Sequence, residues 1–252
     1  MNGSAAVNTN DLVSLPRIVV LTGAGVSAES GIATFRADDG LWEDHHVEDV
    51  ASPEGFARNP ELVYQFYNAR RRALLSGPRP NLAHEALSRF EHAIRERGGD
   101  FLLVTQNVDD LHERAGSQSL LHMHGELLKA RCVVSAQVFP WQEDCDATSL
   151  CACCGVRGRL RPHIVWFGEI PLSMEQIFEA LEAATHFISI GTSGNVYPAA
   201  DFVRVAARSG AETVELNLER SLGSRYFNCA EYGPATEVVP RYFGELAAML
   251  LT

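Results

Sequence analysis

The 252-residue chain has a net charge of −11 at pH 7 and 46% hydrophobic residues, enough to bury the core of one large domain with an insertion. The acidic charge excludes the basic surface that nonspecific nucleic-acid binding needs, and it favours cationic partners such as lysine-rich peptides, although acidity also simply aids solubility. No apolar run approaches the roughly eighteen residues of a membrane span, and the first residues do not form a signal peptide. We therefore expect a cytoplasmic protein with no membrane partner and a flexible leader over residues 1–16.

The first predicted element is a strand over residues 18–21, an apolar run that leads directly into T-G-A-G-V-S-A-E-S-G-I-A-T-F-R. Glycines after a strand let the backbone approach a pyrophosphate, and the free N–H groups of a following helix can bind its charge. The start of this motif, Gly23-x-Gly25-x-x-Ala28, matches a dinucleotide fingerprint, although an ordinary glycine turn gives the same letters. A dinucleotide oxidoreductase would also carry an acidic residue about twenty positions further on. None stands there, and residues 35–40 instead predict a polar loop that closes over a ligand.

The pattern changes to helix between residues 36 and 77. Asn59 and Pro60 mark a helix start, because asparagine caps well and proline is tolerated in the first turn. The apolar stripe of this helix consists of Leu62, Val63, Phe66 and Tyr67. We expect this segment to form a helical lobe over the edge of a sheet.

Three consecutive arginines follow on the same helix. Tyr67 belongs to the apolar stripe, and Arg70, three residues later, lies on the same face. We therefore expect Arg70 to point inward, where a buried guanidinium needs an anion, and Arg71 and Arg72 to point away. The alternative is a solvated helix end whose positive charge is favoured by the helix dipole.

A polar segment, T-Q-N-V-D, ends the apolar run at residues 101–105. Ligands bind beyond the carboxyl ends of strands in open α/β sheets, and Asn107 and Asp109 are competent to bind a carboxamide and ribose hydroxyls, or equally to cap a helix. Further on, His122 and His124 are two residues apart in an extended segment, so only one can face a given pocket. A histidine beside a glycine suits a general base with a pKa near working pH, and a satisfied structural histidine is the alternative.

Five of the six cysteines fall between residues 132 and 154, which predicts a metal site or buried thiols rather than disulfides. Cys151-x-x-Cys154 supplies one pair of ligands for a structural zinc site and Cys132 half of the other, but Ser135 stands where the second partner belongs. Four thiolates would leave no open position for water, so such a zinc would be structural. A metal-free hairpin is the alternative. The candidates for the fourth ligand are Cys145 and Cys153.

Apolar runs recur at residues 186–191 and 213–218, separated by helical segments, as in a parallel sheet covered on both faces. The predicted fold is α/β: a Rossmann-like, doubly wound parallel sheet with an inserted small domain made of a helical lobe and a zinc-ribbon-like hairpin. The polar residues that end the last two strands can line a ligand groove or simply cap turns. The expected domains are residues 17–35, 78–128 and 162–252 for the sheet, and residues 36–77 and 129–161 for the small domain.

The extended motif G-A-G-x-S-x-x-S-G-I-x-x-F-R resembles the cofactor-binding loop of the sirtuins, the NAD-dependent protein lysine deacylases. Further blocks match in the family's order: T-Q-N-V-D from residue 105, H-M-H-G from residue 122, and G-T-S and N-L-E from residues 191 and 217. The resemblance runs from about Arg17 to the C-terminus. The NAD-binding residues that it implies are Gly23, Ala24, Gly25, Ser27, Ala28, Glu29, Thr34, Phe35, Arg36, Trp42, Gln106, Asn107, Asp109, Gly191, Thr192, Ser193, Asn217, Leu218, Glu219 and Ala235.

The resemblance also implies catalytic roles. It places Gln106 and Asn107 at the nicotinamide ribose and Asp109 at the carboxamide, and it selects His124, directly before glycine, as the base, with Asn107 as the second catalytic residue. The substrate amide oxygen would displace nicotinamide from the ribose. His124 would then take a proton from a ribose hydroxyl that attacks the imidate carbon, while Phe35 shields the reactive sugar from water.

The run V-W-F-G-E at residues 165–169 is similar to the segment with which sirtuins bind acyl-lysine peptides by strand addition. In the sirtuin subgroup that removes acidic acyl groups, a Tyr-x-x-Arg pair binds the acyl carboxylate, and an alanine before a small residue and proline leaves room for it. Tyr67, Arg70 and Ala51 match that pattern. The implied substrate-binding residues are Tyr67, Arg70, Ala51, Val165, Phe167, Gly168 and Glu169.

The function implied is an NAD-dependent deacylase of succinyl-lysine and acetyl-lysine that releases nicotinamide and O-acyl-ADP-ribose. NAD would be a co-substrate and zinc, held by Cys132, Cys151, Cys154 and a fourth ligand, structural. The expected partners are acyl-lysine proteins or peptides, and we expect a monomer. The alternatives are an NAD-dependent mono-ADP-ribosyltransferase, a hydride-transferring Rossmann oxidoreductase and a nucleotide-sensing scaffold without turnover.

Overall fold

A six-stranded parallel sheet forms the centre of the computed structural model, which describes residues 15–34, 41–42 and 45–250. Every neighbouring pair is parallel, in the order β11-β10-β9-β1-β4-β5. The chain builds the sheet outward from β1 to β5 on one side and then from β9 to β11 on the other, so the topological switch point lies between β1 and β9. The strands are β1 (Arg17–Thr22), β4 (Asp100–Thr105), β5 (Leu120–His122), β9 (His186–Ile190), β10 (Glu212–Asn217) and β11 (Cys229–Tyr232).

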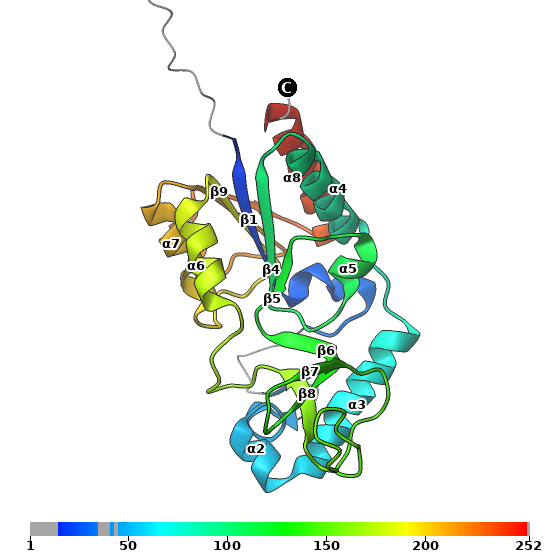
Figure 1. The fold of residues 1–252 in the computed structure, drawn as a ribbon. Helices are drawn as coiled ribbons and strands as arrows, with labels where there is room; N and C mark the ends of the chain where they lie inside the picture. Colours follow the sequence, from blue (N-terminus) through cyan, green and yellow to red (C-terminus); the bar gives the residue numbers. More distant parts are fainter. Residues whose placement is uncertain (1–14, 35–40, 43–44, 251–252) are drawn as a thin grey trace, which may run out of the picture.

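Helices cover both faces of this sheet, as Figure 1 shows. Alternate residues of β1 point to opposite faces, so Ile18 and Val20 join one core and Val19 and Leu21 the other. The first core lies under α4 (Leu82–Glu96) and α8 (Ala235–Leu250). The second lies under α6 (Met174–Ala183) and α7 (Phe202–Arg208). The predicted doubly wound α/β class is confirmed.

A separate antiparallel sheet with the strand order β7-β6-β8 lies below the parallel sheet in the view of Figure 1. Its strands are β6 (Gly125–Cys132), β7 (Val138–Pro140) and β8 (Leu160–Ile164). β6 begins before residue 129 and β8 ends after residue 161, so the antiparallel sheet is longer than the sequence pattern indicates; the domain boundaries themselves stay predictions. The helices beside it are α1 (Val47–Val50), α2 (Pro53–Arg58) and α3 (Pro60–Ser76).

The remaining elements are short. The glycine motif forms two 3₁₀ turns where a helix was expected. The short elements are η1 (Ala24–Val26), η2 (Ala28–Ser30), β2 (Leu41–Trp42), β3 (His45–His46), α5 (Leu111–Ala115), η3 (Ala199–Asp201) and η4 (Ser224–Tyr226). Among the described residues, no helix combines the length and apolarity needed to cross a membrane.

Helix α3 confirms the predicted start and stripe but corrects one arginine. Asn59 accepts a hydrogen bond from the N–H of Leu62, and Tyr67 is fully buried. Arg71, expected to point away, is fully buried as well: its Nε donates to the Leu127 carbonyl (3.0 Å), which lies on β6. Positions four apart share a helix face just as positions three apart do, so Arg71 follows Tyr67 inward. Arg72 is exposed, as expected.

Candidate functional site

Three glycines interlock at the switch point between β1 and β9. The N–H of Gly23 donates to the Ile190 carbonyl and that of Gly25 to the Gly191 carbonyl, both at 2.9 Å. A Cβ on Gly23 or Gly25 would come within 2.8 Å of Gly191 backbone atoms, and Gly191 itself has φ +62°. Only glycines fit here. The two loops therefore form one close-packed backbone platform at the carboxyl edge of the sheet, where a pyrophosphate can approach.

Ser27 connects this platform to the loop that follows β4. Its Oγ donates to Oδ2 of Asp109 (3.1 Å) and accepts from Nδ2 of Asn107 (3.2 Å), and it lies 3.3 Å from Nε2 of His84. Nδ1 of His84 lies 3.3 Å from the backbone N of Asn81 and 3.0 Å from its side-chain Oδ1, so Asn81 holds the ring with Nε2 facing Ser27. The hydroxyl of Ser27 thus donates its one proton to Asp109 and accepts from Asn107. This directed chain orients Asn107 and Asp109, both 7% exposed, at the strand end where cofactor ligands were predicted.

Burial dominates the electrostatics of this network. It lowers the pKa of His84 to about 4 and raises the pKa of Asp109. His112 is buried beside His84, with ring centroids 4.8 Å apart, and its pKa is lowered well below the ordinary value by burial. Both histidines are therefore neutral hydrogen-bonding groups. The sequence analysis did not identify either histidine. The only sequence signal is that each lies in the first turn of a helix, shortly after its polar N-cap residue.

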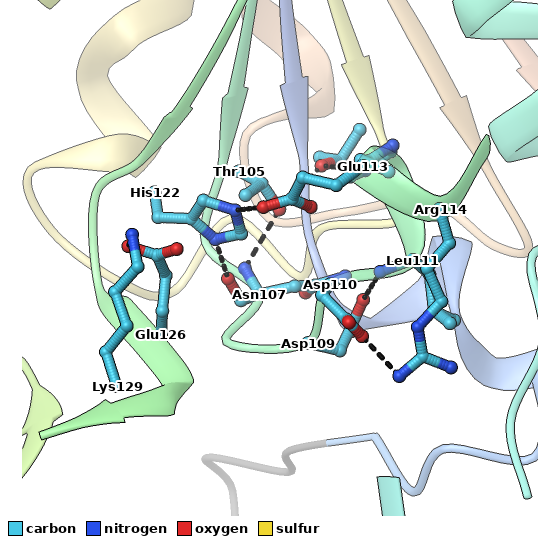
Figure 2. Close-up of polar contacts among 12 residues, drawn as sticks. Thr105, Asn107, Asp109, Asp110, Leu111, Glu113, Arg114, His122, Glu126 and Lys129 are labelled. Atoms are coloured by element: carbon cyan, nitrogen blue, oxygen red, sulfur yellow. Dashed lines mark hydrogen bonds and ion pairs between the residues drawn. The ribbon is translucent and has the colours of Figure 1, made fainter. Parts of the chain in front are cut away.

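The two histidines of the H-M-H-G block bind successive carbonyls of the same loop. Nδ1 of His124 bonds the Gln106 carbonyl and Nδ1 of His122 the Asn107 carbonyl, both at 3.1 Å. Burial lowers the pKa of His124, so its imidazole is neutral and basic near pH 7. Burial would also lower the pKa of His122, but its hydrogen bond to Glu113 raises it (Figure 2). Of these two histidines, only His124 has its pKa shifted toward the neutral form that a general base needs.

The rest of the predicted cofactor residues lie around the platform or outside the described residues. Asn217 donates to the Thr192 carbonyl (2.7 Å) and so joins the ends of β9 and β10. Glu29 accepts from both the N–H and the hydroxyl of Thr236, so it caps the start of α8. Phe35 and Arg36 lie outside the described residues, and the side chain of Trp42 is not described. Exposed residues of the set are Ala28, Thr34, Ser193, Leu218 and Glu219; Ala24, Gln106 and Ala235 are partly buried.

The predicted peptide segment runs directly past His124. The N–H of Val165 donates to the His124 carbonyl, and that of Phe167 to the Ala51 carbonyl, both at 2.9 Å. Gly168 has φ +86°, a conformation that turns the chain after Phe167. These bonds join the segment to His124 on one side and to Ala51 of the helical lobe on the other.

Glu169, also predicted to bind substrate, lies in an ion-pair network. Its carboxylate accepts from Arg131 and Arg161, at 2.7 Å each, and from the N–H of Trp166. Burial would raise its pKa, but these bonds and charges lower it. Through these partners, Glu169 stabilises the turn at residues 166–169.

The predicted acyl-binding residues share an apolar cluster with this segment. Ala51, Tyr67 and Trp166 pack in one core, and Nε1 of Trp166 donates to the Tyr67 hydroxyl (3.0 Å). Burial raises the pKa of Tyr67, so its hydroxyl is neutral. Arg70 is partly buried; it donates to the Phe66 carbonyl (3.0 Å), and its guanidinium lies 3.2 Å from the centre of the Phe66 ring.

Four cysteine sulfurs converge at the end of the antiparallel sheet. Cys132, Cys151, Cys153 and Cys154 have their sulfur atoms within 4.8 Å of one another. Backbone N–H groups of Ser135 and Val134 point at the Cys132 sulfur and lower its pKa to about 6. Of the two candidates for the fourth ligand, the structure selects Cys153; Cys145 is buried elsewhere, and burial raises its pKa to about 11. The donor set fits a structural zinc ion, whose four thiolates lie about 3.8 Å apart.

The fold and the site thus define a nucleotide-binding α/β protein with a second, small module that carries a cluster of four cysteines. The Sir2 family model matches residues 23–198, and the chain belongs to the Sir2 family. A protein of Pasteurella multocida called NAD-dependent protein deacylase is 61% identical over 91% of this chain and 97% of its own length. One of the same name from Salmonella typhimurium is 58% identical over 92% of this chain and 84% of its own.

Solved structures agree with this family assignment. The structure of a Sir2 homologue in complex with NAD superposes with a TM-score of 0.82 and 37% identity, covering 92% of this chain and 90% of that one. The structure of Sir2 bound to acetylated peptide superposes with a TM-score of 0.76 and 29% identity, covering 91% and 93%.

Proposed function

We propose that this protein is an NAD-dependent protein lysine deacylase that accepts succinyl-lysine and acetyl-lysine. The observation that carries the proposal is the loop at residues 105–109. It holds Asn107 and Asp109 against Ser27 of the glycine platform, and the neutral His124 against its own backbone. The relatives named as NAD-dependent protein deacylases support the same reaction.

The residues present fit NAD as the co-substrate. The glycine platform brings bare backbone to the carboxyl edge of the sheet, where a pyrophosphate can approach, and a Cβ on Gly23 or Gly25 would break its packing against Gly191. Asn107 and Asp109 orient the ribose and the carboxamide, and Asn217 and Glu219 lie at the strand end proposed for the second ribose. His124 accepts a proton from a ribose hydroxyl, and Val165 to Phe167 pair with the substrate peptide beside it.

The test is release of nicotinamide from NAD in the presence of acetyl, succinyl or glutaryl peptides. We expect acyl loss only when NAD is present, with O-acyl-ADP-ribose as the co-product. Production of NADH would instead indicate an oxidoreductase, a peptide carrying ADP-ribose would indicate a transferase, and NAD binding without nicotinamide release would indicate a scaffold.

Ser27→Ala tests the hydrogen-bond chain. The change removes the bond to the buried carboxylate of Asp109, and a hydrogen bond to a charged group is worth about 1.5–3 kcal/mol. At about 1.4 kcal/mol per tenfold, we expect the KM for NAD to rise roughly ten- to hundredfold in steady-state assays. The matched control is Ser88→Ala, a buried serine of α4 outside this chain of hydrogen bonds. An unchanged KM in Ser27→Ala would contradict the proposed role.

Zinc is the second proposed component. We expect about one zinc per chain by metal analysis of protein never exposed to chelator. Cys153→Ser should lower both the zinc content and the melting temperature, because metal binding stabilises a folded site. The control is Cys229→Ser, an exposed cysteine outside the cluster. Full zinc content in Cys153→Ser would reject the assignment of the fourth ligand.

A monomeric state and a cytoplasmic location stay predictions from the sequence. Gel filtration with light scattering tests the first, and cell fractionation the second.

A further inference from the structure

A second group of metal-ligand side chains lies beside the loop at residues 105–109. Glu113 of α5, His122 at the end of β5 and Glu126 of β6 bring one ligand atom each to within 4.8 Å of the others (Figure 2). The NAD and peptide roles proposed above use none of the three. We infer that the Glu113–His122–Glu126 cluster binds a divalent transition-metal ion of the zinc class, at a site distinct from the four cysteines.

The orientation of His122 points to a metal ligand. Its side chain is 7% exposed, and its Nδ1 lies 3.1 Å from the Asn107 carbonyl, an acceptor outside the cluster. A carbonyl can only accept, so Nδ1 carries a proton, and Nε2 is the nitrogen that faces Glu113 at 2.8 Å. A metal-bound histidine characteristically donates its other N–H to a backbone carbonyl in this way. A proton or a metal ion can bridge Nε2 and the carboxylate.

The three ligand atoms can reach a small metal ion if they move slightly closer together. Ligands at about 2.1 Å from a tetrahedral zinc ion lie about 3.4 Å from one another. The longest separation here, within 4.8 Å, therefore has to shorten by about 1.4 Å at most. Glu113 has 40% of its side chain exposed, so its carboxylate has room to rotate and the ion has a path of entry.

The donor set selects the class of ion. One imidazole and two carboxylates suit Zn²⁺ and Co²⁺, whereas Mg²⁺ and Ca²⁺ prefer ligand sets made of oxygen alone. Three protein ligands leave a fourth position for water. The cysteine cluster offers four thiolates instead, so the two sites differ in the spectrum of a bound cobalt ion.

Lys129 is the cation that competes for this site. Its Nζ lies 2.6 Å from Oε2 of Glu126, and Figure 2 shows the two side chains alongside His122. The ammonium group neutralises one of the two carboxylates that the metal needs. Removal of that charge should therefore strengthen metal binding, an effect opposite in sign to loss of a ligand.

The experiment is a titration of the purified, tag-free protein, with its cysteine site already loaded with zinc, by CoCl₂. Equilibrium dialysis should give one further equivalent of cobalt, with visible bands of a nitrogen and oxygen site and no thiolate charge-transfer band. Glu113→Gln and Glu126→Gln should each weaken this binding at least about tenfold. Lys129→Met should tighten it severalfold.

The matched control is Glu85→Gln, an exposed glutamate of α4 that forms an ion pair with Arg89. It should bind cobalt like the parent protein. Absence of a second equivalent, a thiolate charge-transfer spectrum, or equal affinity in Glu113→Gln and the parent would each overturn the proposal. None of these readouts requires deacylase activity, so they test the metal site independently of the proposed function.

Discussion

His124→Ala is expected to lower the deacylation rate by about 10²- to 10⁴-fold, the typical contribution of a general base, while NAD affinity changes only a few-fold. The reason is geometric and electrostatic. The ring of His124 is fixed by the Gln106 carbonyl, and its own carbonyl accepts from the N–H of Val165, in the segment proposed to pair with the substrate peptide. A proton acceptor in the reaction contributes little to binding of the ground state. Rates from nicotinamide release and affinities from calorimetry separate the two effects.

The pH dependence distinguishes His124 from its neighbour. A base works in its neutral form, and burial lowers the pKa of His124 below 6.5, so the midpoint of any acidic loss of kcat/KM, which reports the free enzyme, should lie below pH 6.5. The pKa of His122 is raised, so a reaction that depended on neutral His122 would have the midpoint of its acidic loss above pH 6.5. His122→Ala is the control and should have a much smaller effect. Equal losses in both variants, or an acidic limb of kcat/KM whose midpoint lies above pH 6.5, would contradict the assignment.

The parallel sheet could be predicted because its strands are continuous apolar runs. Residues 18–21 and 187–190 are buried on both faces of the sheet, and short apolar runs between turn residues are typical of such central strands. The glycine pattern of a phosphate-binding loop, in contrast, implied a helix after the glycines. The close contact of Gly25 with Gly191 holds that segment in two 3₁₀ turns, a tertiary effect that no local pattern contains.

The site was predicted less completely than the fold because much of it depends on contacts between distant segments. Asn107 and Asp109 were found from their position after a strand, but their support by His84 through Ser27 joins three segments of the chain. The fourth cysteine was ambiguous for a related reason. Cys153 stands between the two cysteines of the C-x-x-C pair, at a position to which the motif assigns no ligand, and only the folded loop brings its sulfur beside that of Cys132.

Helix periodicity alone did not predict the burial of Arg71, because that burial depends on hydrogen-bond partners from other segments. Its burial depends on the Leu127 carbonyl and on Asn68, which accepts from Nη1 at 2.7 Å. The first of these acceptors belongs to β6, far away in the sequence. A charged residue with such partners can occupy an interior position that its chemistry alone would exclude.

Arg70→Met is expected to lower the efficiency of desuccinylation about a hundredfold while deacetylation persists. Breaking a fully buried ion pair costs about 3–5 kcal/mol, because the remaining charge is left desolvated. Arg70 is only partly buried, so the lower end applies, and about 3 kcal/mol corresponds to two orders of magnitude at about 1.4 kcal/mol per tenfold. An acetyl group has no carboxylate, so its deacylation does not depend on this ion pair. The measurement is kcat/KM on succinyl and acetyl forms of one peptide.

The choice of control follows from the structure. Arg71→Met would remove a buried guanidinium that joins α3 to β6, so it would perturb folding. Arg72 is exposed and pairs with Asp144 on the surface, and Arg72→Met should leave the succinyl-to-acetyl ratio unchanged. Tyr67→Phe should shift the ratio in the same direction as Arg70→Met but less, since it deletes one hydrogen-bonding hydroxyl while the ring still packs on Trp166. A ratio that stays constant in Arg70→Met would remove the acyl-carboxylate role from this arginine and leave a general deacylase.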